Sequence, residues 1–255
     1  MKRACLIGYG AIAKTVEQAL ALHRERVALV GVVVRAPGCA ASAAIHAPPF
    51  FTSIEQVVAA GCDVAVECAG HAALRALGPA CLAAGMDLIV ASVGALADQP
   101  TEQALRDAAA RGGGRLIIPS GAVAGLDGIA AARVAGIERV VYRAKKPARS
   151  WRGTAAQQMI DLEEIRSTKV FYRGNAREAC ALFPQNANVT AAISLAGIGF
   201  ENTEVTLEAD PEAACNQHHV RVEGRFGTIE ILLNVNALPD NPLAKFLPKT
   251  RGTPP

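Results

Sequence analysis

The segment Gly8-Tyr9-Gly10-Ala11-Ile12-Ala13 indicates the fold of the first half of this 255-residue chain, because it matches the pattern G-x-G-x-x-G/A. It follows a short apolar run and leads into apolar residues at helical spacing. In this pattern the first glycine permits a tight turn, the second lets the backbone approach a pyrophosphate, and the small last residue lets the helix pack on the strand. The N–H groups that begin the helix attract the phosphates. We therefore predict that a dinucleotide binds at Gly8, Gly10, Ala11, Ile12 and Ala13; a glycine-rich turn without a ligand is the alternative.

The rest of the first half alternates between strand and helix patterns. Apolar, β-branched runs predict strands, and apolar residues spaced three and four apart predict helices. The expected strands cover residues 3–7, 27–34, 64–68, 88–91 and 116–118, with helices between them. Because strand, helix and strand in repetition require right-handed crossovers, we predict a parallel sheet.

The pattern changes after Pro119. Only two or three helices separate the next strand-like segments, which are expected at residues 137–144, 168–172, 204–209, 219–222 and 229–235. We therefore predict an α/β protein with an N-terminal Rossmann dinucleotide-binding domain over residues 1–119. A second α+β domain, over residues 120–235, is expected on a mixed, largely antiparallel sheet. The tail, residues 236–255, is expected to pack back on the first domain.

Composition excludes several classes of protein. Hydrophobic residues make up 51% of the chain and the formal net charge is only +3, so we expect no nucleic-acid partner. No apolar run approaches the ~20 residues that span a bilayer, so no membrane partner is expected. The seven cysteines include no CxxC pair. We therefore predict neither a metal site nor a disulfide framework, and reduced thiols favour a cytoplasmic protein.

The second half of the fingerprint departs from the NAD pattern. An acidic residue about 20 positions further on normally ends the second strand and binds the ribose 2′-hydroxyl. Here that strand ends in Val34-Arg35, and no Asp or Glu occurs between Glu25 and Glu55. A guanidinium matches phosphate geometry, so Arg35 is a candidate for binding a 2′-phosphate. A solvated arginine is the alternative. We therefore expect both NAD and NADP as cofactors.

Several segments, taken together, resemble the L-aspartate dehydrogenase family, which is linked to NAD biosynthesis. They follow the family's order across most of the chain and comprise Val66-Glu67-Cys68-Ala69-Gly70-His71, Ser92-Val93-Gly94-Ala95-Leu96, Pro119-Ser120-Gly121-Ala122, Lys146-Pro147, Pro184-Gln185-Asn186-Ala187-Asn188-Val189 and Asn216-Gln217-His218. The resemblance implies a Rossmann domain and a C-terminal domain that forms a homodimer. It also implies reversible NAD(P)-dependent oxidative deamination of L-aspartate to oxaloacetate and ammonia via iminosuccinate.

The resemblance also assigns residues. His218 matches the family's catalytic histidine in N-x-H, and Asn216 of the same motif is expected to bind substrate. Ala122 and Asn188 match positions that contact the cofactor. Adjacent side chains on a strand point to opposite faces. The N-x-H register therefore selects His218 for the site and leaves His219 as a structural residue.

Two further groups are candidates for ligand binding. The basic run from Lys145 to Arg149 includes Lys146, which matches the family's Lys-Pro and is predicted to bind a substrate carboxylate; a solvated loop is the alternative. The turn Cys68-Ala69-Gly70 and the following His71 come after a predicted parallel strand, where ligands bind in such sheets. We expect these four residues to line the cofactor site, with helix capping as the alternative for His71.

A histidine can take a proton from water and return it to a leaving amine, as the implied reaction requires. Two other functions stay open: another two-domain NAD(P)-dependent imine or oxo-acid reductase, and a non-catalytic dinucleotide-binding sensor. The C-terminal sequence departs from the family, in which Asn241-Pro242 usually leads into a helix. Here Pro248, Pro254 and Pro255 predict that no long helix forms.

Overall fold

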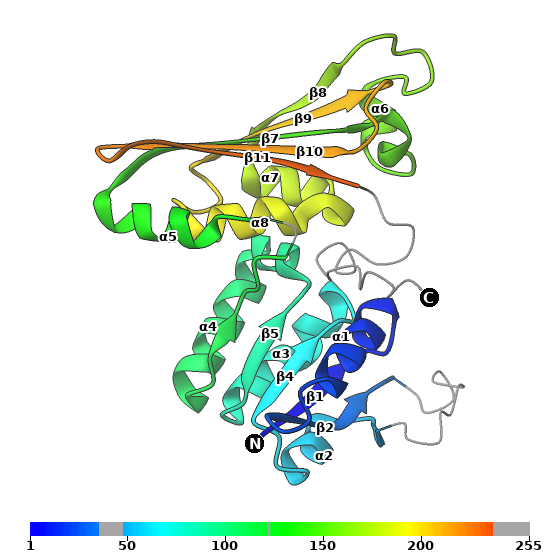
Figure 1. Ribbon diagram of the computed structural model, residues 1–255, viewed down its shortest axis with the longest axis vertical. Coiled ribbons are helices and arrows are strands. Elements are labelled where there is room, and N and C mark those ends of the chain that lie inside the picture. The colour runs from blue at the N-terminus through cyan, green and yellow to red at the C-terminus, as the bar shows by residue number, and fades with distance from the viewer. Residues whose placement is uncertain (36–47, 122, 237–255) are drawn as a thin grey trace, which may run out of the picture.

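Each half of the chain builds one sheet (Figure 1). The computed structural model describes residues 1–35, 48–121 and 123–236. The expected packing of the tail and the absence of a helix after Asn241-Pro242 both lie outside the described residues.

The first sheet is parallel throughout, in the order β3-β2-β1-β4-β5-β6. Its apolar strands are covered by helices, as a parallel sheet requires. The elements are β1 (Lys2–Ile7), α1 (Ala11–Ala21), β2 (Val27–Val33), β3 (Phe50–Phe51), α2 (Ile54–Ala59), β4 (Val64–Glu67), α3 (His71–Ala83), β5 (Asp87–Val90), η2 (Val93–Ala97), α4 (Gln99–Gly112) and β6 (Leu116–Ile117).

The strand order reverses between β1 and β4, so the loops that follow these two strands leave the sheet side by side. The N–H of Cys68 donates to the carbonyl of Ile7 at 2.9 Å, which ties the two strand ends together. Ligands of doubly wound sheets bind at such a reversal, beyond the carboxyl ends of the strands. The fold therefore brings the fingerprint turn and the turn at residues 68–70 to one edge.

The second sheet has the order β11-β10-β7-β9-β8, with β7 and β9 parallel and the other pairs antiparallel. Its elements are α5 (Leu126–Ala135), β7 (Ile137–Pro147), η3 (Ala148–Trp151), α6 (Ala156–Met159), β8 (Lys169–Asn175), α7 (Ala176–Leu182), η4 (Pro184–Asn186), α8 (Ala187–Ala196), β9 (Thr203–Asp210), β10 (Asn216–Gly224) and β11 (Gly227–Val235). The predicted fold class, a Rossmann domain with a second domain on a mixed sheet, is confirmed.

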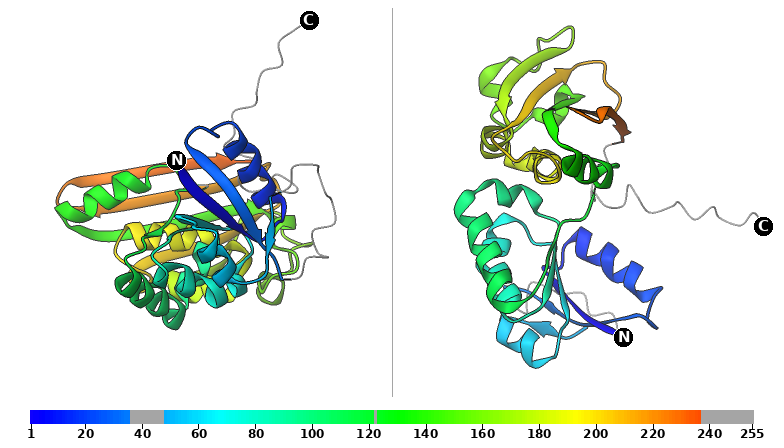
Figure 2. Two further views of the ribbon diagram at one scale, coloured as in Figure 1. Left: turned by 90° about the horizontal axis from the view of Figure 1, so that it is seen from below. Right: turned by 90° about the vertical axis from the view of Figure 1, so that its left-hand side faces the viewer.

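Helices α5, α7 and α8 cover one face of the second sheet and lie between that sheet and the first domain (Figures 1 and 2). We call the helix-covered face the inner face and the opposite face the outer face. The chain has few aromatic residues, and several gather at one end of the inner face. The ring of Trp151 lies 4.7 Å from that of Phe171 and 6.0 Å from that of Phe183, centroid to centroid.

The two domains meet where η2 packs against the start of α8. An added Cβ on Gly94 would lie 2.6 Å from Cβ of Ala187, so the backbones approach closely there. The guanidinium of Arg177 also donates to the carbonyl of Ala97 across the same junction. The inner face of the second sheet and the carboxyl edge of the first are thereby held in a fixed relation.

Candidate functional site

The fingerprint turn joins β1 to α1 at the carboxyl edge of the parallel sheet. Gly8 has a φ of +88°, and an added Cβ there would lie 2.7 Å from Cβ of Ala69. Gly10 is the N-cap of α1 and makes no side-chain cap, and an added Cβ there would meet no atom within 4 Å. The first N–H groups of a helix lack intrahelical partners. This open turn therefore fits the pyrophosphate of a dinucleotide.

The other predicted residues of the fingerprint lie in the first turn of α1. Ala13 is fully buried in one cluster with Leu6 and Val32, so the helix packs closely on the sheet at this small residue. Ala11 is exposed and Ile12 half-buried. The backbone N–H groups of the first turn of α1 therefore lie next to the open position at Gly10.

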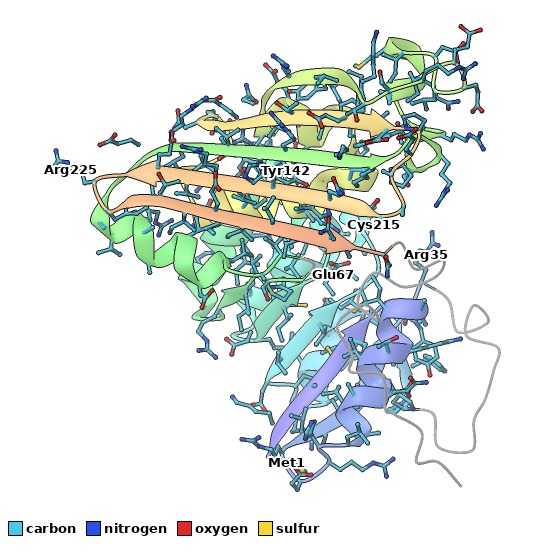
Figure 3. All side chains as sticks on the ribbon, turned by 45° about the horizontal axis from the view of Figure 1, so that its top comes forward. Met1, Arg35, Glu67, Tyr142, Cys215 and Arg225 are labelled. Carbon is cyan, nitrogen blue, oxygen red and sulfur yellow. The ribbon has the colours of Figure 1, made fainter. Side chains whose placement is uncertain are left out.

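A buried carboxylate to which the sequence assigned no role ties the neighbouring loops together. Glu67 ends β4 and is fully buried (Figure 3). Its Oε1 accepts hydrogen bonds from the N–H groups of Ala69 and Gly70, both at 2.7 Å, and from the Ser92 hydroxyl at 3.1 Å. Its Oε2 accepts from the Ser92 N–H at 3.0 Å. These four hydrogen bonds fix the loops after β4 and β5 to the end of β4.

The remaining predicted cofactor residues of the first domain lie on the same edge. Burial raises the pKa of the Cys68 thiol to about 12, so this residue packs as an apolar side chain. Gly70 has a φ of +110°, and an added Cβ there would meet no atom within 4 Å. Arg35 follows β2 and is exposed (Figure 3). Ala122 lies outside the described residues.

His71 and Asn188 come from different domains and meet at the domain junction. Oδ1 of Asn188 accepts a hydrogen bond from the N–H of Gly94 at 2.9 Å, and the Asn188 side chain also hydrogen-bonds to His71. Burial, followed by the charge of Arg75, lowers the pKa of His71. The N-cap of α3 is Gly70 and His71 is its first residue. The His71 side chain therefore bridges the domains and does not cap its helix.

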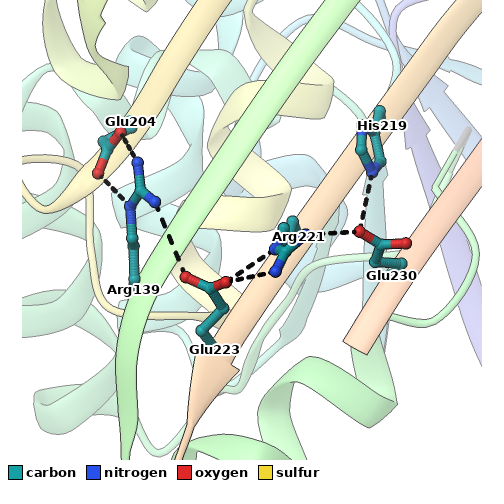
Figure 4. A network of polar contacts seen from close by, with 6 residues as sticks. All are labelled: Arg139, Glu204, His219, Arg221, Glu223 and Glu230. Carbon is teal, nitrogen blue, oxygen red and sulfur yellow. Dashed lines mark hydrogen bonds and ion pairs between the residues drawn. The ribbon is translucent and has the colours of Figure 1, made fainter. Parts of the chain in front are cut away.

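His218 lies on β10 and points to the inner face of the second sheet, where it is 4% exposed. Its Nδ1 lies 2.7 Å from Oη of Tyr142 on β7. The two rings are nearly parallel, with an interplanar angle of 10° and centroids 6.0 Å apart. His219 faces the outer side, where its Nε2 lies 3.8 Å from a carboxylate oxygen of Glu230 (Figure 4). The two histidines thus separate as strand alternation predicts.

Lys146, on β7, shares the inner face with His218 and is 9% exposed. Its Nζ donates a hydrogen bond to Oδ1 of Asn186. The same ammonium lies 5.1 Å from the centroid of the Trp151 ring, within cation–π range. These contacts orient a charged group that is largely shielded from solvent.

Asn216 begins β10 on the same face as His218. Gln217 pairs with Lys145 in the ladder, which places Asn216 next to Lys146 at the end of the strand. Oδ1 of Asn216 is buried and has no hydrogen-bond partner among residues 1–35, 48–121 and 123–236. A buried acceptor without a partner is unfavourable. This oxygen therefore fits an N–H donor that a ligand brings.

The rest of the basic run does not gather at the site. Lys145 points to the opposite side of β7 and lies 3.4 Å from a carboxylate oxygen of Asp210. Arg149 is exposed in η3. Because neighbouring side chains of a strand point to opposite faces, the run splits, and Lys146 is the member that lies beside His218.

A short segment of the second domain joins the two groups of residues. Asn186 contacts Lys146, and two positions further on Asn188 contacts Gly94 and His71. The side chains assigned to substrate therefore connect, through residues 186–188, to the edge assigned to the cofactor. In the sequence Asn186 appears only within the segment from Pro184 to Val189, and its contact with Lys146 depends on the tertiary fold.

The described part of the chain lacks two features. No group of three or more His, Cys, Asp or Glu side chains in it is arranged to hold a metal ion. None of its helices has the length and apolar character needed to cross a bilayer.

Comparisons with known proteins agree with this arrangement. The family described as "Aspartate dehydrogenase, C-terminal" matches residues 127–249, and "Homoserine dehydrogenase, NAD binding domain" matches residues 8–119. The chain is 42% identical to the L-aspartate dehydrogenase of Serratia proteamaculans over 97% of its own length and 93% of that protein. It is 40% identical to the L-aspartate dehydrogenase of Brucella anthropi, over 93% and 88% of the two chains. The crystal structure of aspartate dehydrogenase from Thermotoga maritima superposes with a TM-score of 0.75 at 26% identity, covering 92% of this chain and 89% of that one.

Proposed function

The chain belongs to the L-aspartate dehydrogenase family, and from this premise we propose that it catalyses the reversible NAD(P)-dependent oxidative deamination of L-aspartate. The products are oxaloacetate and ammonia, formed via iminosuccinate. The observation that supports this most strongly is that His218 and Lys146 share the inner face, which Asn186 and Asn188 connect to the cofactor edge.

The dinucleotide is held at the carboxyl edge of the first sheet in this proposal. The turn from Gly8 to Ala13 receives the pyrophosphate, and residues 68–71 line the crevice next to it. Asn188 completes the cofactor site from the second domain. Arg35 is exposed at the end of β2 and binds the 2′-phosphate, so the enzyme accepts NADP as well as NAD.

The substrate lies against the inner face of the second sheet. The ammonium of Lys146 binds a carboxylate of aspartate, and burial of this cation strengthens the interaction. The unsatisfied Oδ1 of Asn216 accepts a hydrogen bond from the substrate's amino group. When bound, NAD(P) supplies the hydride acceptor for the substrate Cα.

His218 carries out the proton transfers. It takes a proton from the water that adds to the imine carbon of iminosuccinate and returns it to the nitrogen that leaves as ammonia. Its low exposure keeps bulk water from competing at the same nitrogen. Positioned general acid–base groups contribute about 10²–10⁴-fold to the rate of such steps.

We further propose that residues 1–119 form the dinucleotide domain and residues 120–235 the catalytic and dimerisation domain of a cytoplasmic homodimer that serves NAD biosynthesis. Two copies associate through the outer face of the second sheet, which no described helix covers (Figure 1). Leu232 lies there, 72% exposed, directly opposite His219 in the ladder. Light scattering of the wild type and of Leu232→Lys tests this; a wild-type monomer contradicts it.

The test of the function is an assay of NAD(P)H formation with L-aspartate, compared with D-aspartate and L-glutamate, in the presence of either cofactor. We expect turnover of L-aspartate with both cofactors. Tight NADH binding without turnover of any of these substrates would instead support a dinucleotide-binding sensor. Turnover of a different imine or oxo-acid would support another reductase of this layout.

A further inference from the structure

Tyr142 is a buried polar residue of the inner face that none of the sequence motifs includes. It lies on β7 (Figure 3) and is 1% exposed. Its Oη is 2.7 Å from Nδ1 of His218, and the two rings are nearly parallel. The orientation of the His218 ring is therefore fixed from the neighbouring strand.

We propose that Tyr142 is a positioning residue that sets the tautomer of His218. Its hydroxyl oxygen accepts a hydrogen bond from Nδ1–H, so the neutral imidazole keeps its proton on Nδ1 and exchanges protons with the substrate at Nε2. This inference rests on the proposed role of His218 as the proton-transfer group.

The tyrosine remains a phenol throughout. Burial, with a smaller contribution from Cys180, raises the pKa of Tyr142 far above its ordinary range. The phenol therefore neither releases nor takes up a proton under working conditions. Because its oxygen accepts a hydrogen bond from Nδ1–H in both the neutral and the protonated ring, the contact persists while Nε2 gains and loses its proton.

The hydroxyl proton of Tyr142 needs a direction away from His218 for this arrangement to hold. Cys180, on α7, is close enough to contribute to the raised pKa of Tyr142. The Cys180 thiol itself donates to the carbonyl of Ala187 at 3.6 Å, which leaves the lone pairs of the sulfur to act as an acceptor. Sulfur is a weak acceptor, and in this proposal it receives the phenol proton.

The direct test needs no variant of Tyr142. Nitrogen-15 NMR of wild-type protein labelled at histidine, at a pH where the ring is neutral, reports which nitrogen carries the proton. The signals of His218 are assigned by their loss in His218→Ala. We expect a protonated Nδ1 and an unprotonated Nε2. A neutral ring protonated on Nε2 overturns the proposal.

Tyr142→Phe adds a kinetic test. We expect the neutral ring to shift toward the Nε2–H tautomer and kcat for L-aspartate to fall about tenfold, as loss of roughly one hydrogen bond implies. The KM of the cofactor stays unchanged. An unchanged kcat in a folded Tyr142→Phe protein also overturns the positioning role.

Tyr172→Phe is the matched control. Tyr172 is another buried tyrosine of this sheet, but its hydroxyl donates to the carbonyl of Asn175 at 3.0 Å. We expect neither the NMR signals of His218 nor kcat to change. If Tyr142→Phe does not fold, the wild-type spectrum alone decides the tautomer. If the wild type does not oxidise aspartate, the proposed function fails while the spectrum still tests the tautomer.

Discussion

Glu67→Gln removes the acceptor that holds the loops after β4 and β5. The glutamine oxygen can replace Oε1 and keep its donors, but the new NH₂ group then faces the N–H of Ser92, which lies 3.0 Å from Oε2 in the native protein. A hydrogen bond to a charged group contributes about 1.5–3 kcal/mol, and an unsatisfied buried donor costs about 1–3 kcal/mol. We expect the free energy of unfolding to fall by about 3–5 kcal/mol, which lowers the melting temperature by roughly 10 °C in a protein of this size.

The loosened loops also border the crevice proposed for the cofactor, so NADH should bind more weakly. Thermal unfolding followed by circular dichroism and titration of NADH fluorescence measure the two effects separately. Glu163→Gln is the control, since the Glu163 side chain is 65% exposed and forms a surface ion pair with Arg152. If Glu67→Gln melts and binds NADH like the wild type, Glu67 does not hold these loops.

Three further predictions concern the cofactor edge and the domain junction. Gly8→Ala should lower the melting temperature, because the residue needs a φ of +88° and its Cβ would lie 2.7 Å from Cβ of Ala69. Gly10→Ala should leave the melting temperature unchanged but raise the KM of the cofactor. Equal melting temperatures for the two variants would contradict the role given to Gly8 in this turn. Arg35→Ala should raise the KM for NADP and leave that for NAD unchanged, and no change for NADP would remove Arg35 from the site. Because burial lowers the pKa of His71 in the folded protein, the unfolded chain binds a proton more readily, so the free energy of unfolding should fall as the pH drops below about 6.5. Chemical unfolding between pH 7.5 and 5 should show a smaller fall in His71→Gln than in the wild type. The same pH dependence in both proteins would contradict this role of His71.

Much of the fold could be predicted because the local sequence patterns of its strands and turns match the elements that form. The apolar strands of the first half and the glycine turn at residues 8–13 indicate a parallel sheet before any tertiary contact is known. The short strand β3, at Phe50–Phe51, was not predicted, since two residues are too few to give a periodic signal. The strand containing His218 was predicted to begin at residue 219 and begins at Asn216, because the polar sequence Asn-Gln-His gives no strand pattern.

The candidate site could be predicted only where a motif points to a residue. N-x-H and Lys-Pro make His218 and Lys146 candidates, and alternation along the strand places His218 and His219 on opposite faces. Glu67 and Tyr142 were missed because their importance comes from what they contact. The bond from Tyr142 to His218 joins neighbouring strands 76 positions apart in sequence, and that pairing depends on the register of β7 against β10.

The basic run from Lys145 to Arg149 shows a second limit, which is that a wrongly predicted strand end leaves the direction of the side chains undetermined. It is the densest group of cations near the domain boundary, and it was expected to follow the strand predicted at residues 137–144. The strand instead continues to Pro147, so Lys145 and Lys146 point to opposite faces. A predicted strand that extended to Pro147 would have placed Lys145 and Lys146 on opposite faces.

The central claim is that His218, and not its neighbour, transfers the protons in aspartate deamination. Steady-state measurement of kcat/KM for L-aspartate in His218→Ala and His219→Ala tests it most directly, because the two substitutions are chemically identical and lie on opposite faces of one strand. We predict a loss of about 10²–10⁴-fold for His218→Ala with unchanged NADH binding, and near wild-type activity for His219→Ala. Equal activities in the two variants would contradict the account.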